Sequence, residues 1–326
     1  MMQISPETQL FIREHSSDDV RVLALQAKKY PDIDMPTAIT QIAGRKVAAE
    51  KIPSWWEIEK IWYPKHLSLE QCSSEITARY KARLLQGDSL TDLTGGFGID
   101  CSFLATGFKS ATYVERQEEL CEIAAHNFPV LNLNHINIKN EDGVTYLQVM
   151  SPVDCLFLDP ARRNEHGGKT VAISDCEPNV AELEELLLQK ANRVMIKLSP
   201  MLDLSLALKE LKQTQEVHIL SVNNECKELL ILLGQTSPAE ISIHCVNLFT
   251  KGTQKEQHFV FTREQEQCSE CTYTDSLETY LYEPNASLLK AGAFRSIAAA
   301  YPVRKLHPNS HLYTSCLLYT SPSPRD

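Results

Sequence analysis

Short apolar runs alternate with amphipathic stretches through the middle of the chain. Three of these runs end near Asp92, Glu115 and Asn140, and two more lie within 153–158 and 193–200. Short apolar runs that stop at turn residues predict buried strands, whereas the stretches between them repeat apolar residues at helical spacing. Strands that alternate with helices predict an α/β fold with a parallel, doubly wound sheet.

After the last of these strands, the pattern changes to pairs of neighbouring strands. Segments 216–222 and 229–233, joined by NNECKE, predict an antiparallel hairpin at the edge of the sheet. The alternating segments EISIHCVNLF and KEQHFVFTRE flank TKGTQ and predict a second hairpin. Residues 1–86, in contrast, follow helical patterns that prolines interrupt at 31–36 and 53–64.

The sequence DLTGGFGID joins the first predicted strand to the helix that follows it. Glycines in such a turn adopt conformations that other residues avoid, and they let the main chain approach a ligand closely. The helix that starts near Asp100 offers unpaired N–H groups at its positive end. We therefore expect a cofactor to contact the end of this strand and the turn, at Asp92, Thr94, Gly95, Gly96 and Gly98.

Glu115 ends the next predicted strand, where an acidic side chain can accept hydrogen bonds from two ribose hydroxyls. The glycines follow the order G-G-x-G instead of the G-x-G-x-x-G that seats a dinucleotide pyrophosphate. An acid at Asp92 would repel a pyrophosphate but suits a cationic ligand that carries an amino acid. The pattern therefore favours S-adenosylmethionine (SAM) over NAD. Arg116, Asp142 and Gly143 complete the predicted site, with Asp142 accepting from the adenine amino group.

The strand predicted at 153–158 ends in Asp159 and Pro160, and proline cannot continue a central strand. The chain must turn there, so we expect the Asp159 carboxylate and the Pro160 carbonyl to face the cofactor pocket. Arg162 and Arg163 follow directly, and forked guanidinium groups at the mouth of this pocket suit a substrate phosphate. Pairing with nearby acids is the alternative role for both arginines.

Over roughly residues 87–236 the chain resembles class I SAM-dependent methyltransferases. More narrowly, EQCSSEITARYKA, DLTGGFGID, LDPARR, YLYEPNASLLKAGAF and LHPNSHLYTS are similar to bacterial methyltransferases with a THUMP-like C-terminal domain. This resemblance implies a Rossmann-like seven-stranded sheet, SAM as the cofactor, and a small α+β, ferredoxin-like C-terminal segment.

In-line methyl transfer is the chemistry we expect, with Asp159 and Pro160 as the catalytic residues that hold the acceptor nitrogen. The turn DPAR departs from the DPPY-type motif of amino-methylating enzymes, because no aromatic residue follows to stack on a target base. The methylated atom is therefore left open by the sequence.

The predicted organisation has five parts, which are a helical N-terminal domain (1–86), a SAM-dependent methyltransferase domain (87–236), a β-rich extension (237–277), the ferredoxin-like segment (278–315) and a tail (316–326). The tail CLLYTSPSPRD looks like translated sequencing-adapter text. We therefore expect this tail to be non-native and the THUMP-like domain to be missing.

RNA, either tRNA or rRNA, is the expected partner, although the formal net charge of −10 is unusual for a nucleic-acid enzyme. Lysines and arginines in the first 90 residues lie among Trp55, Trp56 and Trp62, and this mixture suits stacking on unpaired bases. Packing of these tryptophans in the core is the preferred alternative. The acidic charge favours a small-molecule or protein methyltransferase as the rival function, and a non-catalytic RNA-binding module is a third possibility.

We expect a cytoplasmic protein without a membrane partner, because the start MMQISPETQL is polar and no apolar stretch approaches the roughly 18 residues of a membrane span. The ten cysteines are irregularly spaced, which suits reduced thiols. Cys268 and Cys271 form a single CxxC pair, whereas a structural zinc site needs four ligands. We therefore expect no metal.

Overall fold

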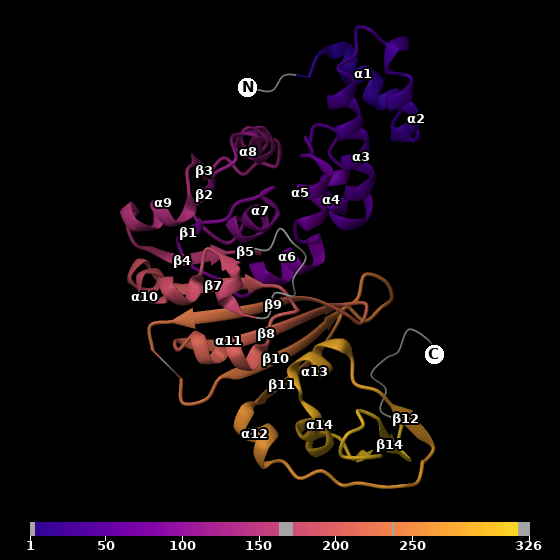
Figure 1. The fold of residues 1–326 in the computed structure, drawn as a ribbon, viewed down its shortest axis with the longest axis vertical. Coiled ribbons are helices and arrows are strands. Elements are labelled where there is room, and N and C mark those ends of the chain that lie inside the picture. The colour runs from indigo at the N-terminus through magenta and orange to yellow at the C-terminus, as the bar shows by residue number, and fades with distance from the viewer. Residues whose placement is uncertain (1–3, 163–171, 237, 319–326) are drawn as a thin grey trace. The chain divides into compact units, whose positions relative to one another are not determined.

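The computed structural model describes residues 4–162, 172–236 and 238–318, without the side chains of His66 and Arg162. The chain divides into two compact units, Met1–Leu156 and Phe157–Asp326. Figure 1 shows their elements in order along the chain. The division into the five predicted parts stays a prediction.

The first unit begins with helices. They are α1 (Pro6–Glu14), α2 (Val20–Leu25), the 3₁₀ helix η1 (Ala27–Lys29), α3 (Met35–Lys51), α4 (Pro53–Trp56), α5 (His66–Gln71) and α6 (Glu75–Ala82). Side chains of Ser5, Asp19 and Asp34 cap the first turns of α1, α2 and α3, and so satisfy amide groups that no helical carbonyl reaches. Proline in the first turn of α1, α3 and α4 costs no helical hydrogen bond, so the sequence sets where these helices begin.

The predicted strands and helices of the first unit follow. They are β1 (Ser89–Asp92), α7 (Ile99–Ala105), β2 (Ser110–Glu115), α8 (Glu118–Val130), β3 (Ile136–Asn140), α9 (Gly143–Val149) and β4 (Val153–Leu158), which continues into the second unit. The strand order is β4-β1-β2-β3, and β1–β2 and β2–β3 pair in parallel. Parallel strands point their carboxyl ends to one edge, so the ends of β1 and β2 lie together.

The second unit contains β5 (Ala161–Arg162), η2 (Ile173–Asp175), β6 (Cys176–Glu177), α10 (Val180–Lys190), β7 (Ala191–Leu198), α11 (Leu204–Glu210), β8 (Thr214–Val222), β9 (Glu225–Gly234), β10 (Ser242–Leu248) and β11 (Glu256–Thr262). Its strand order is β11-β10-β8-β9-β7. The pairs β7–β9, β8–β9 and β10–β11 are antiparallel, whereas β10 runs parallel to β8. The second predicted hairpin therefore continues the sheet beyond the first.

The turn between β8 and β9 is shorter than the sequence predicted. Only Asn223 and Asn224 lie between the strands, and their φ angles are 48° and 65°. Two consecutive positive φ values define the type I′ turn that matches the twist of a hairpin. Asparagine tolerates the left-handed region that this turn requires, so Asn223 and Asn224 complete the turn by themselves. The rest of NNECKE therefore belongs to β9.

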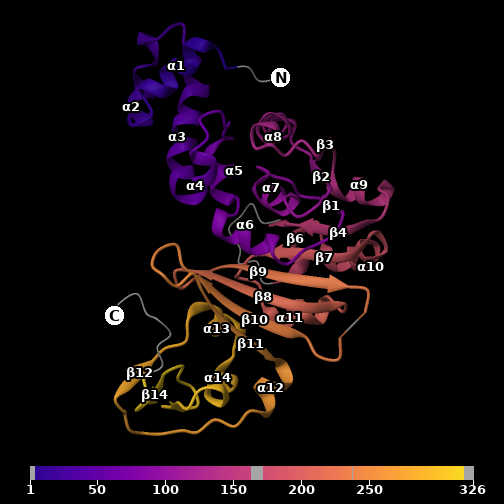
Figure 2. The same ribbon diagram turned by 180° about the vertical axis from the view of Figure 1, so that it is seen from behind.

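The C-terminal part consists of α12 (Arg263–Cys268), β12 (Tyr280–Tyr282), α13 (Ala286–Ala291), α14 (Phe294–Ala300), β13 (Arg304–Lys305) and β14 (Tyr313–Ser315). The three strands form a small antiparallel sheet in the order β12-β14-β13. Helix α13 packs against β8, β9 and β10, as the two views in Figures 1 and 2 show.

The predicted fold class is confirmed: a mixed α/β protein with a large sheet, a helical N-terminal region and a small α+β segment at the C-terminus. The large sheet has nine described strands instead of the seven that the resemblance implied, because β10 and β11 extend it. Among the described residues, no helix is long and apolar enough to cross a membrane.

Candidate functional site

The turn between β1 and α7 has the left-handed conformations that its glycines predict. Gly96 has φ 53°, and Gly98 has φ 87° at the N-cap of α7. The Gly95 amide donates to the Val114 carbonyl at 2.9 Å, and the Gly98 amide donates to the Gly95 carbonyl at 2.8 Å. The Gly95–Val114 hydrogen bond thus joins the turn to β2.

Gly95 and Gly96 of the turn and Gly143 of α9 differ in how closely other atoms pack against them. A Cβ on Gly95 would lie 2.3 Å from Cε2 of Tyr113, and one on Gly143 would lie 2.1 Å from the Leu93 carbonyl oxygen. These two glycines therefore let protein atoms pack closely. A Cβ on Gly96 would meet nothing nearer than the Thr94 carbonyl at 3.8 Å. Gly96, unlike Gly95 and Gly143, therefore has no protein atom packed tightly against its Cβ position.

Glu115, at the end of β2, holds the turn by its side chain. One carboxylate oxygen accepts from the Gly96 amide at 2.9 Å and the other accepts from the Gln117 amide at 2.8 Å. The residue is buried, with 8% of its surface exposed. Each carboxylate oxygen has a second lone pair, so these bonds leave capacity for ligand hydroxyls.

Two other predicted acids also bond to the main chain. Asp92 is buried at the end of β1 and accepts from the Thr94 amide at 2.9 Å. Asp142 is the N-cap of α9 and accepts from the amides of Val144 and Thr145. Arg116 follows Glu115 and is exposed. The hydrogen bonds of Asp92 and Glu115 therefore connect the end of β1 and the end of β2 to the glycine turn.

A buried ion pair beside this turn was not predicted. The Lys81 ammonium of α6 lies 2.8 Å from an Asp100 carboxylate oxygen and donates to the Ser73 hydroxyl at 2.7 Å. Ser73 in turn donates to the other Asp100 oxygen at 2.6 Å. Lys81 is fully buried. Asp100 lies in the first turn of α7, so this network fixes the helix that the glycine turn begins.

The tryptophans of the N-terminal region have mixed environments. Trp55 is buried and meets Phe97 of the glycine turn edge-on, with ring centroids 5.2 Å apart. Trp62 stacks on His126 at 3.7 Å, and Trp56 is exposed beside the Arg45 guanidinium. Core packing is thus confirmed for Trp55, which supports the turn from behind.

In the second unit, Asp159 follows β4 and forms an ion pair with Lys197 of β7. The Lys197 side chain is 10% exposed and the Asp159 side chain 36% exposed. Lys197 was missed, although a lone lysine within the apolar run RVMIKLSP was a signal that a partner charge lies nearby. Pro160 is buried, as a turn that closes a central strand requires.

Of the two predicted substrate arginines, the structure describes only the backbone of Arg162. The backbone of Arg162 belongs to β5 and pairs with Cys176 of β6. Its side chain, like the whole of Arg163, lies outside the described residues.

This chain is similar to a solved structure and, in its C-terminal part, to a family model. A solved structure of a "putative methyltransferase" from Porphyromonas gingivalis W83 matches with 34% sequence identity and a TM-score of 0.84, covering 98% of this chain and 81% of that protein. A family model described as a ferredoxin-like domain matches residues 280–323. Among curated proteins, none matches the chain.

Two further structural matches are weaker. A modification subunit of a putative type I restriction enzyme from Vibrio vulnificus YJ016 is 11% identical, with a TM-score of 0.41, 62% of this chain and 56% of that one covered. A putative methyltransferase from Streptococcus mutans in complex with SAH is 13% identical, with a TM-score of 0.35, 49% of this chain and 96% of that one covered. Neither is close enough to support a statement about this chain.

The ferredoxin-like description confirms that part of the sequence expectation, and the THUMP-like part stays a prediction. The match to the Porphyromonas gingivalis protein extends over nearly the whole chain, at 34% identity. This chain therefore belongs to the methyltransferase family that the Porphyromonas gingivalis protein represents.

Proposed function

We propose that this protein is a SAM-dependent methyltransferase that methylates an RNA base, in tRNA or rRNA, by in-line transfer. The observation that carries the SAM assignment is Gly96, which has a left-handed conformation, has no atom closer than 3.8 Å to its Cβ position and donates its amide hydrogen to the Glu115 carboxylate. Membership of a methyltransferase family supports the same assignment.

The residues of the first unit fit the proposed cofactor. Glu115 would accept from the ribose hydroxyls, Gly96 would leave room for the main chain to approach, and Asp92 would attract the cationic amino-acid part. Asp142 would accept a hydrogen bond from the adenine amino group, while its Oδ1 continues to cap α9. When bound, SAM supplies a methyl group that its sulfonium has already activated.

The proposed catalytic group is Asp159, with the Pro160 carbonyl beside it in sequence. The carboxylate would accept the hydrogens of the acceptor nitrogen and draw off the proton that this nitrogen loses on methylation. Lys197 would hold the Asp159 side chain in one orientation through their ion pair. Positioning then supplies most of the rate, because the methyl donor is already reactive.

RNA as substrate is supported by the consecutive arginines after Pro160, since guanidinium groups bind phosphates in two-pronged fashion. Overall charge favours the second candidate: at −10, the chain suits a small-molecule or protein acceptor better than a polyanion. The two candidates share the cofactor site and differ only in what approaches Asp159.

Calorimetry with SAM, its demethylated product and NAD tests the cofactor. We expect binding of SAM and its product, and tight NAD binding without a response to SAM would refute the assignment. Transfer of a labelled methyl group to separated tRNA, rRNA, protein and small-molecule fractions tests the acceptor. Label in RNA supports the first candidate, label in another fraction supports the second, and SAM binding without transfer to any fraction supports a non-catalytic module.

A further inference from the structure

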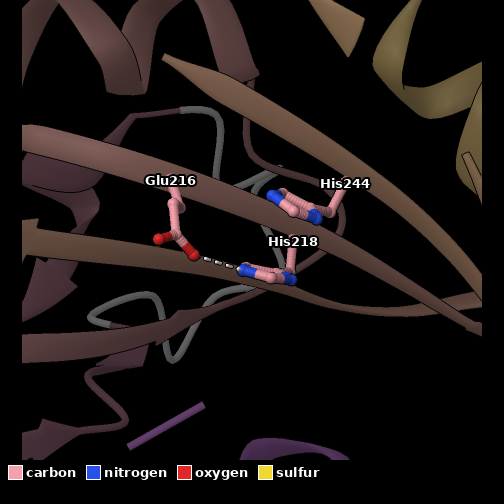
Figure 3. Close-up of side chains that lie close together, drawn as sticks. All are labelled: Glu216, His218 and His244. Carbon is pink, nitrogen blue, oxygen red and sulfur yellow. Dashed lines mark hydrogen bonds and ion pairs between the residues drawn. The ribbon is translucent and has the colours of Figure 1, made fainter. Parts of the chain in front are cut away.

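One face of the sheet in the second unit gathers imidazole and carboxylate side chains from separate strands. Glu216 and His218 lie on β8, and the parallel pairing of β8 with β10 sets His244 directly opposite His218. Figure 3 shows the three side chains on this face, with both rings beside the Glu216 carboxylate. We call Glu216, His218 and His244 the strand cluster.

The donor atoms of the strand cluster are close together. One ligand atom from each residue lies within 4.8 Å of the other two. Glu216 Oε2 and His218 Nε2 are 3.2 Å apart, and the two imidazole rings stack with centroids 4.3 Å apart. Donors of a tetrahedral zinc ion, each about 2.0–2.1 Å from the metal, lie roughly 3.3 Å from one another. The Glu216–His218 pair already has this spacing.

His258 of β11 provides the support that a metal-bound histidine usually has. Its Nε2 lies 3.1 Å from Nδ1 of His244, so one of the two nitrogens carries the shared proton. A metal-ligating histidine typically donates its other ring N–H to such a partner, which fixes the tautomer and aims the free lone pair. With His244 donating from Nδ1, its Nε2 becomes the available ligand atom.

Arg193 of β7 is the competing partner for this carboxylate. Its guanidinium lies 3.0 Å from Glu216 Oε1, whereas Oε2 is the oxygen that faces His218. Arg193 thus orients the carboxylate from one side and leaves the other oxygen toward the two rings. The same contacts also describe a hydrogen-bonded network without a metal, and this is the alternative that an experiment must separate.

We propose that Glu216, His218 and His244 bind one divalent transition-metal ion, zinc by the nature of the donors, with His258 as the residue that orients His244. Two imidazoles and one carboxylate select zinc, copper or nickel over magnesium and calcium, which prefer oxygen ligands. Three protein ligands leave a fourth position for water. The site departs from the sequence expectation of no metal, because its ligands come from strands that only the fold brings together.

The test uses the full-length protein after EDTA treatment and dialysis. Zinc chloride is titrated against it in competition with a chromophoric chelator, and Co²⁺ is added separately to record the visible absorption of a tetrahedral site. We expect one equivalent to bind, and the cobalt spectrum to show imidazole ligation. His244→Gln should weaken zinc binding by at least about 100-fold, and His258→Gln should weaken it about 10–100-fold as the loss of an orienting partner.

His307→Gln is the matched control, since His307 is an exposed histidine outside the strand cluster. Thermal unfolding in EDTA shows whether each variant folds like the wild type. Glu216→Gln gives a second reading that keeps the side-chain volume. If the wild type binds no more zinc than His244→Gln does, or if His307→Gln is weakened equally, the strand cluster is a hydrogen-bonded network only. None of these readouts depends on methyl transfer, so failure here leaves the proposed function untouched.

Discussion

The glycine turn of the first unit and the polar side chains of β7 and β8 in the second unit are held in opposite ways. In the turn, Asp92 and Glu115 accept hydrogen bonds from main-chain amides within the same turn and strand ends. In the second unit, Lys197 pairs with Asp159 and His218 with Glu216, so each of these side chains depends on another side chain. Only substitution by proline removes a main-chain amide N–H, whereas many substitutions remove a side-chain partner. The two regions should therefore respond differently to the same kind of change.

The largest effect we expect comes from a side-chain pair placed beside the turn. Lys81→Met leaves the Asp100 carboxylate buried without its ammonium partner, which costs about 3–5 kcal/mol of unfolding free energy. Urea unfolding followed by circular dichroism measures the loss. Lys109→Met is the control, because its ion pair with Asp88 is exposed and should contribute little. Equal losses for both variants would show that burial of the Lys81–Asp100 pair adds nothing to its contribution.

Asp159→Ala should have the next largest effect, on turnover. If the carboxylate holds the methyl acceptor, the rate falls by roughly 100-fold or more while SAM affinity stays within a few-fold of the wild type. Single-turnover methylation and calorimetry measure the two quantities. Asp275→Ala, an exposed aspartate in the same unit, is the control. A parallel loss of turnover and SAM affinity would assign Asp159 to the cofactor site or to the fold.

Gly95→Ala probes the close packing within the turn. The added Cβ would overlap the Tyr113 ring, and overpacking of this kind costs about 1–3 kcal/mol. Thermal and urea unfolding measure the change. Gly107→Ala is the matched control, since its Cβ would meet only the Leu104 carbonyl at 3.7 Å, an ordinary contact. Unchanged stability in Gly95→Ala would mean that Tyr113 shifts freely and that the turn is less rigid than its contacts indicate.

Glu115→Gln should give the smallest effect. The amide keeps the size of the side chain and one acceptor oxygen but loses the charge that strengthens bonds to ribose hydroxyls, so SAM binding should weaken by about 1–2 kcal/mol. Calorimetry measures the SAM affinity, and Glu118→Gln, an exposed residue on α8, is the control. An unchanged SAM affinity would remove Glu115 from the proposed ligand set and leave it with its bonds to Gly96 and Gln117 alone.

The same contrast explains what the sequence could predict. The strand ends at Asp92, Glu115 and Asn140 are confirmed, because apolar runs and turn residues are local signals. The contacts of Lys81 with Asp100 and of Lys197 with Asp159 were missed, because each joins segments that only tertiary packing brings together.

The error in the turn length of the first hairpin has a related origin. The type I′ turn at Asn223 and Asn224 was predicted as a longer segment, since polar residues in β9 resemble turn residues until their strand partner is known. The parallel pairing of β10 with β8, on which the strand cluster depends, leaves no periodic signal in either segment.

The two-residue turn between β8 and β9 also has a consequence for the order of folding. A hairpin closed by so short a turn forms within about 1–10 μs, whereas β10 must find β8 from beyond β9, a slower search between distant segments. Amides of β8 and β9 should therefore become protected from hydrogen exchange before those of β10 and β11. His218 is in place early, and the chain completes the strand cluster only when β10 docks.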